Sequence, residues 1–119
     1  MFKINADKSI EITRGDRATI KLTNKKSVFN VGDIIKFSIV EKKNYNNLIF
    51  QKQYEVEESG DTFNITLTSE DTTIGDIISD KKEYWYEIEY NGNQTPIGFD
   101  DNKAKKFILY PEAPNKEEE

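Results

Sequence analysis

The sequence predicts an all-β protein, built as an antiparallel sandwich or barrel. The composition favours strands, because it includes seven Phe, six Tyr and one Trp together with many Ile and Thr. Aromatic and β-branched side chains suit the pleated surface of a sheet. Apolar and polar residues also alternate along most of the chain, which gives each strand one buried and one solvated face. About eight such segments follow one another at even spacing, separated by turn residues.

The alternating segments define the expected strands. In the N-terminal half these strands cover residues 10–13, 18–23, 35–39 and 48–56. Within the last of them, one face is expected to carry Leu48, Phe50, Tyr54 and Val56, with Lys52 interrupting it. In the C-terminal half, strands are expected at 63–67, 84–90 and 106–110, with a weaker run at 95–99. The Asn-rich stretch 44–47 is expected to be a hairpin connection.

Four residues are expected to build turns between these strands. Gly15 and Gly32 supply the backbone freedom that a tight turn needs. Asp16 and Asp33 follow them, and an Asp side chain can bond to nearby backbone. The sequence Arg14-Gly15-Asp16 also spells the tripeptide that integrin ligands use. Because it lies between two strand patterns, we interpret it as a turn.

One segment breaks the strand pattern. Thr68-Ser69-Glu70-Asp71 has the form of a capping box, with Thr68 at the cap and Asp71 reaching back to it. One short helical turn is therefore expected near residues 69–73. The following Ile74, Ile77 and Ile78 are spaced as on a helix, but Gly75 lies among them. This stretch is either a second short turn or a loop whose Ile side chains close one end of the core.

Composition and charge exclude several classes of protein. The chain has no Cys and no His, so disulfides, thiolate zinc sites and Ser-His-Asp triads are absent. The net charge of −5 and a pI near 4.9 disfavour nucleic-acid binding. The sequence contains no apolar run of the roughly 20 residues that span a membrane, and its start lacks a signal-peptide core. The chain is therefore expected to be made in the cytoplasm.

The length of 119 residues suits one domain. We expect a single β-sandwich over residues 1–110. Residues 111–119 contain two Pro and end in Lys-Glu-Glu-Glu, so they are expected to form a disordered acidic tail.

Two groups of carboxylates are candidate sites. Glu87 and Glu89 could serve a glycosidase, but catalytic carboxyls need burial, and a solvated strand face is the preferred interpretation. The run Asp100–Asn102, with Asp76 or Asp80, could bind calcium, but it lacks the spacing of a calcium loop. We therefore expect no catalytic residue, no metal and no cofactor.

Trp85 is the strongest candidate for an interface. Its neighbours Tyr84 and Tyr86 are expected to face the core, so Trp85 points outward among Glu83, Glu87 and Glu89. An outward Trp can anchor a protein interface or stack on a sugar. The alternative is that a tail, a loop or a neighbouring sheet covers it.

The order of these signals resembles a known family. Ala18-Thr19-Ile20 follows the first turn, Ile35 to Ile39 follows the second, and Tyr84-Trp85-Tyr86 follows the capping box. Together they resemble small β-sandwich modules of phage and prophage structural proteins from Gram-positive bacteria, with the N-terminal domain of baseplate upper proteins as the best-known relative. The resemblance covers roughly residues 8–110 and implies an Ig-like antiparallel β-sandwich of about seven to nine strands.

This resemblance implies a non-enzymatic assembly module of a phage or prophage particle, associated with the tail or baseplate. Its expected partners are other virion proteins, with self-association as a further contact, and neither nucleic acid nor membrane. Two alternatives remain at this point. One is a carbohydrate-binding module with an exposed aromatic platform, and the other is an Ig-like domain of a bacterial surface protein.

Overall fold

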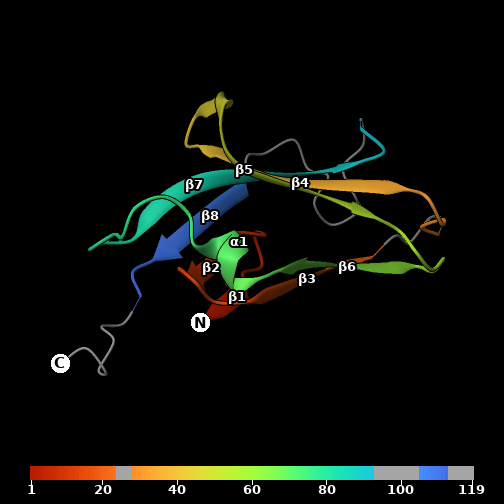
Figure 1. Cartoon of the computed structure of the whole chain (residues 1–119), viewed down its shortest axis with the longest axis horizontal. Coiled ribbons are helices and arrows are strands. Elements are labelled where there is room, and N and C mark those ends of the chain that lie inside the picture. The colour runs from red at the N-terminus through yellow and green to blue at the C-terminus, as the bar shows by residue number, and fades with distance from the viewer. Residues whose placement is uncertain (24–27, 93–104, 113–119) are drawn as a thin grey trace.

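A computed structural model describes residues 1–23, 28–92 and 105–112, with only the backbone of Tyr45. The chain forms two sheets packed face to face, one of six strands in the order β1-β2-β8-β7-β4-β5 and one of two strands, β3-β6 (Figure 1). The expected all-β sandwich with one short helix is confirmed. The elements are β1 (Phe2–Ile4), β2 (Ile10–Thr13), β3 (Ala18–Thr23), β4 (Ile34–Glu41), β5 (Asn44–Glu55), β6 (Thr62–Leu67), α1 (Ser69–Thr72), β7 (Lys82–Tyr90) and β8 (Lys105–Tyr110).

One strand pair departs from the antiparallel pattern. β2 and β8 run parallel, from Ile10 opposite Phe107 to Thr13 opposite Tyr110, and the other named pairs are antiparallel. β2 and β8, which lie near the two ends of the described chain, are therefore neighbours within the larger sheet.

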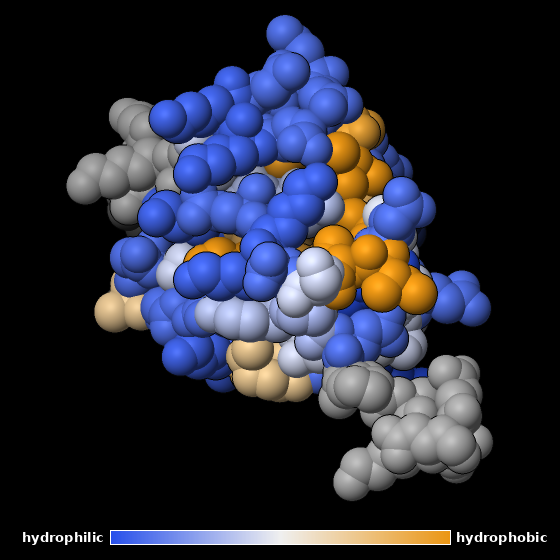
Figure 2. All heavy atoms as spheres, turned by 90° about the vertical axis from the view of Figure 1, so that its left-hand side faces the viewer, coloured by the Kyte–Doolittle hydropathy of each residue, from blue (hydrophilic) through white to orange (hydrophobic). Residues whose placement is uncertain are grey.

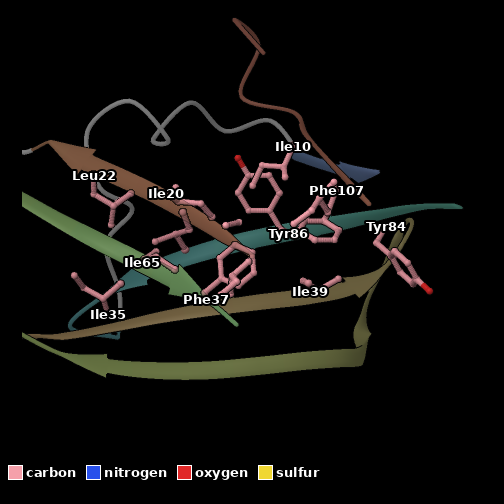
Figure 3. Close-up of a cluster of buried hydrophobic side chains, with 14 of the residues drawn as sticks. Ile10, Ile20, Leu22, Ile35, Phe37, Ile39, Ile65, Tyr84, Tyr86 and Phe107 are labelled. Carbon is pink, nitrogen blue, oxygen red and sulfur yellow. The ribbon is translucent and has the colours of Figure 1, made fainter. Parts of the chain in front are cut away.

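The core lies between the two sheets. Alternation in each strand sends one set of side chains inward, so Ile20 and Ile65 of the smaller sheet point toward Phe37 and Tyr86 of the larger one (Figure 3). The Phe37 ring centroid lies 5.6 Å from that of Tyr86 and 6.3 Å from that of Phe107. Burial of each large apolar side chain stabilises the fold by about 1.5–3 kcal/mol, so this cluster is the main source of stability.

The β4–β5 hairpin corrects two expectations. Its turn lies at Lys42 and Lys43, where Lys43 has a positive φ of 62°, and residues 44–47 belong to β5. Phe50 pairs with Ile39 but Leu48 pairs with Val40, so one extra residue is inserted between the two pairs. This β-bulge turns Leu48 to the face opposite Phe50. The prediction that Leu48 shares the inner face was therefore wrong.

The predicted capping box is present at α1. The Asp71 amide donates to Thr68 Oγ1 at 3.2 Å, and the Thr68 amide donates to Asp71 Oδ2 at 2.8 Å. Lys52 Nζ, on the inner face of β5, lies 2.7 Å from the same Asp71 oxygen. The lysine that interrupts the apolar face thus joins the edge strand to the helical turn. The bond from Lys52 and the two bonds at Thr68 lower the pKa of Asp71 against the opposing effect of burial.

The loop interpretation holds for the connection from residue 73 to 81. Ile74 is 5% exposed and Ile78 packs against the core, while Ile77 is 82% exposed. This connection is held by Arg14, whose side chain is buried. Arg14 Nε donates to the Ile74 carbonyl at 3.1 Å, Nη2 donates to the Gly75 carbonyl at 2.6 Å, and Nη1 forms an ion pair with Glu112. We call this set of contacts the Arg14 clamp. The weaker run at 95–99 lies outside the described residues, as do residues 113–119 of the predicted tail.

Replacement of Arg14 is expected to destabilise the whole sandwich. Arg14→Ala leaves two backbone carbonyls without their donor and empties a buried volume, so the free energy of unfolding should fall by about 2–4 kcal/mol. Urea unfolding followed by circular dichroism measures the loss. Glu112→Gln is the matched control, because Glu112 is partly exposed and its ion pair should contribute less than about 1 kcal/mol. Equal losses in the two variants would show that the backbone contacts do not matter.

Candidate interaction surface

The outer face of the six-stranded sheet carries the outward residues of β7. Glu83, Trp85, Glu87 and Glu89 alternate with the buried Tyr84, Tyr86 and Ile88, as expected. Trp85 lies opposite Val40 on β4 and opposite Lys106 on β8. The structure therefore brings Trp85 together with residues that lie far from it in the sequence.

An apolar row crosses this face at Trp85. The Trp85 row, as we define it, consists of Leu48, Val40, Trp85 and Lys106, which lie on the adjacent strands β5, β4, β7 and β8. Val40 points outward and is still only 3% exposed, whereas Leu48 is 50% exposed and Trp85 is half-buried. The row is thus an apolar strip from Leu48 to Trp85, with a shielded centre at Val40, an open end at Leu48 and the charged Lys106 at its other end.

The β4–β5 turn and the connection 73–81 lie at the same end of the molecule (Figure 1). Seen from that end, a group of apolar side chains reaches the surface among polar ones (Figure 2). The exposed large apolar residues of β5 and of this connection are Leu48 and Ile77. Apolar surface is therefore available beside the turn that begins β5.

Charged residues border the row on the side of the β4–β5 turn. Glu83 lies 3.0 Å from Lys42 Nζ and 3.9 Å from Lys106 Nζ, and Glu41 lies 3.9 Å from Lys82 Nζ. Each of these pairs is partly exposed and contributes little to stability alone. Glu41 and Lys82 belong to the face that carries Tyr84, so the charges next to Trp85 are those of Glu83, Lys42 and Lys106.

Glu87 and Glu89 border the other side of the row. Lys36 lies opposite Glu89 in register, but no ion pair or hydrogen bond joins either carboxylate to a residue in the described part of the chain. Partial burial, with the negative charge of Glu89 as a second cause, raises the pKa of Glu87. A positive group brought to this place would relieve that repulsion.

The four predicted turn residues have structural positions. Gly15 and Gly32 have positive φ values of 89° and 95°, which favour glycine. Asp33 accepts from the Asn30 amide at 2.8 Å and from Asn91 Nδ2 at 3.3 Å, and it also accepts from the Tyr90 hydroxyl. The bond from Tyr90, followed by that from Asn30, lowers the pKa of Asp33. Asp16 donates its amide to the Thr13 carbonyl at 3.0 Å.

The Arg14-Gly15-Asp16 tripeptide and the possible calcium ligands lose support as binding sites within the described structure. The Arg14 side chain is committed to the Arg14 clamp, and Asp16 pairs with the N-terminal ammonium, so this tripeptide is used as a turn. Asp76 and Asp80 are exposed, and residues 100–102 lie outside the described part. Among residues 1–23, 28–92 and 105–112, no group of three or more acidic side chains is placed to hold a metal ion.

Sequence reasoning identified Trp85 and its glutamates but missed the rest of the row. Val40 and Lys106 become neighbours of Trp85 only through strand pairing, and Leu48 joins them only through the bulge. The one sequence signal was the alternation in residues 35–39, which, continued by one residue, turns Val40 outward with Lys36 and Ser38.

Comparison with protein-family models, with curated proteins and with solved structures finds no match for this chain. The described helix is too short to cross a bilayer.

Glu87→Gln is expected to stabilise the chain near neutral pH. The pKa of Glu87 is raised on folding. Its contribution to stability is therefore full at a pH below its pKa in the unfolded state, and it is lost as the pH rises through its pKa in the folded state. The free energy of unfolding of the wild type should therefore decrease over that window more steeply than that of the variant. Urea unfolding between about pH 4 and about pH 7 measures this difference. Glu57→Gln, at an exposed carboxylate between strands, is the control. Identical pH slopes in all three chains would contradict the prediction.

Proposed function

We propose that this chain is a non-enzymatic assembly module that acts through protein–protein contact on the outer face of its six-stranded sheet. The observation that carries the proposal is the Trp85 row, an apolar strip bordered by charges on both sides. Protein interfaces have this anatomy, with an apolar centre and a polar rim, and Trp is enriched among their energetic anchors.

The particle in which the module works is proposed from the resemblance of its strand and turn order to phage and prophage structural modules. In this proposal it belongs to a tail or baseplate, and its partners are other virion proteins. The sandwich provides a rigid sheet on which Trp85 is held by its neighbours, which lowers the entropy cost of binding.

Carbohydrate binding is the weaker alternative. A sugar platform needs an open aromatic face, and Trp85 is half-buried between Val40 and Lys106. Trp85 is the one Trp of the chain, so its fluorescence reports on this surface alone. A fluorescence change that saturates with a glycan would favour the alternative.

Changes in the Trp85 row are expected to prevent incorporation into particles. Trp85→Ala and Leu48→Asp should each lower by about tenfold or more the amount of tagged chain that copurifies with particles induced from the encoding bacterium. Quantitative mass spectrometry of gradient-purified particles measures this amount.

Thr19→Asp is the matched control, because Thr19 is exposed on the smaller sheet, away from the Trp85 row. It should be incorporated like the wild type. Thermal unfolding of each variant separates loss of contact from loss of fold. Absence of the wild-type chain from the particles would overturn the phage assignment, and equal incorporation of all variants would overturn the assignment of the surface.

A further inference from the structure

β5 is the longest strand, with twelve residues, and it lies at the edge of the six-stranded sheet (Figure 1). Among the described strands it pairs with β4 alone, on one side. A long edge strand presents a row of backbone donors and acceptors that another strand can use.

The backbone bonds at the end of β5 fix which of its residues face outward. The Val56 amide donates to the Asp33 carbonyl, and the Gly32 amide donates to the Val56 carbonyl, both at 2.9 Å. Both backbone groups of Val56 therefore point toward the β4 side of the strand. In an antiparallel strand the direction alternates from residue to residue. The N–H and C=O groups of Gln51, Gln53 and Glu55 therefore point away from β4, in the plane of the sheet, toward its open edge. The side chains of these three residues are exposed. Within the described part of the chain these backbone groups have no hydrogen-bond partner.

The other edges are less suited to pairing. β1 has only three residues. On β6, the Tyr54 hydroxyl donates to the outward Thr66 carbonyl at 2.6 Å and so occupies part of that edge. The Thr66 backbone points away from β3, so the backbone of its partner Thr19 points away from β6. The residues of β3 whose backbone groups point outward are then Thr19, Lys21 and Thr23, with Lys21 at their centre. A symmetric pairing there would place two lysines opposite each other.

We propose that β5 pairs with β5 of a second copy of this chain, antiparallel and around a two-fold axis at Gln53. In this register Gln53 pairs with Gln53 of the second copy, and Gln51 pairs with Glu55 of the second copy. The outward backbone groups of all three residues can therefore form hydrogen bonds. On the inner face, Lys52 lies opposite Tyr54 of the second copy. No two like charges face each other.

Neighbouring registers are worse for identifiable reasons. A centre at Lys52 places two lysines opposite each other, and a centre at Glu55 does the same with two glutamates. A centre at Gln51 brings the β-bulge at residue 49 into the new ladder. A centre at Tyr54 pairs Gln51 with Glu57, which lies beyond the end of β5. The charges and the bulge therefore select the axis at Gln53.

The dimer rests on the proposed function, which it deepens by naming a second copy as one partner. A two-fold axis perpendicular to the sheet makes one continuous sheet with both Trp85 rows on the same side. Two linked rows would bind a repetitive particle surface more tightly than one. An edge contact is small, so we expect a dissociation constant in the micromolar range or weaker for the free protein.

Disulfide trapping tests the register, because the chain has no Cys of its own. In Gln53→Cys the two Cα atoms should lie about 5.5 Å apart across the axis, within the range for a disulfide. Mild oxidation should give a covalent dimer. Gln51→Cys is the matched control, because its two copies would be four residues apart along the strand, about 13 Å. An equimolar mixture of Gln51→Cys and Glu55→Cys should form the mixed dimer. No dimer from Gln53→Cys, or equal yields from Gln53→Cys and Gln51→Cys, would overturn the proposal.

Gln53→Pro gives a second test that needs no cysteine. The Gln53 amide points outward, so Pro removes no bond to β4, and edge strands tolerate Pro at such positions. It should raise the dissociation constant about tenfold or more, measured by light scattering over a concentration series. Thr19→Pro, at an outward amide of β3, is the control and should dimerise like the wild type. Trp85→Ala should also dimerise while failing to enter particles, so failure of the dimer and failure of the proposed function give different results. A wild type that is monomeric at every concentration would overturn the dimer alone.

Discussion

The Arg14 guanidinium joins three segments that are far apart in the sequence. It leaves the end of β2, reaches the carbonyls of Ile74 and Gly75, and pairs with Glu112 beyond β8. Only a planar side chain with several fixed donors can bond to all three at once, which is why Lys is not equivalent here. The clamp holds in place the connection whose Ile74 side chain closes one end of the core. The end of the sandwich, and the point where the chain leaves it, therefore depend on one residue of a turn.

The strands could be predicted because burial of one face fixes the phase of a strand, as at Ile20 and Ile65. The β4–β5 hairpin could not. Leu48, Ile49 and Phe50 are consecutive apolar residues, so no polar residue marks which of them points outward. Pairing with β4 decides it: the bulge places Leu48 opposite Val40 and Phe50 opposite Ile39. This pairing between strands cannot be read from the β5 sequence alone.

The candidate surface divides in the same way. Tyr84 and Tyr86 flank Trp85, and their burial made its outward direction predictable from β7 alone. Val40 and Lys106 were not predictable as its neighbours, because each comes from another strand. Lys52 looked like an interruption of an apolar face until its partner Asp71, on α1, was known. Contacts within one element follow from the sequence, and contacts between elements follow from the topology.

The parallel pairing of β2 with β8 has a mechanical consequence. Ile10 and Phe107 begin the paired strands together, and Thr13 and Tyr110 end them together. Tension applied between residues 10 and 110 is therefore directed along both strands, in shear. Shear loads the hydrogen bonds of the ladder at the same time, whereas peeling would break them one after another. A sandwich connected in this way resists stretching most strongly where β2 and β8 meet in its larger sheet.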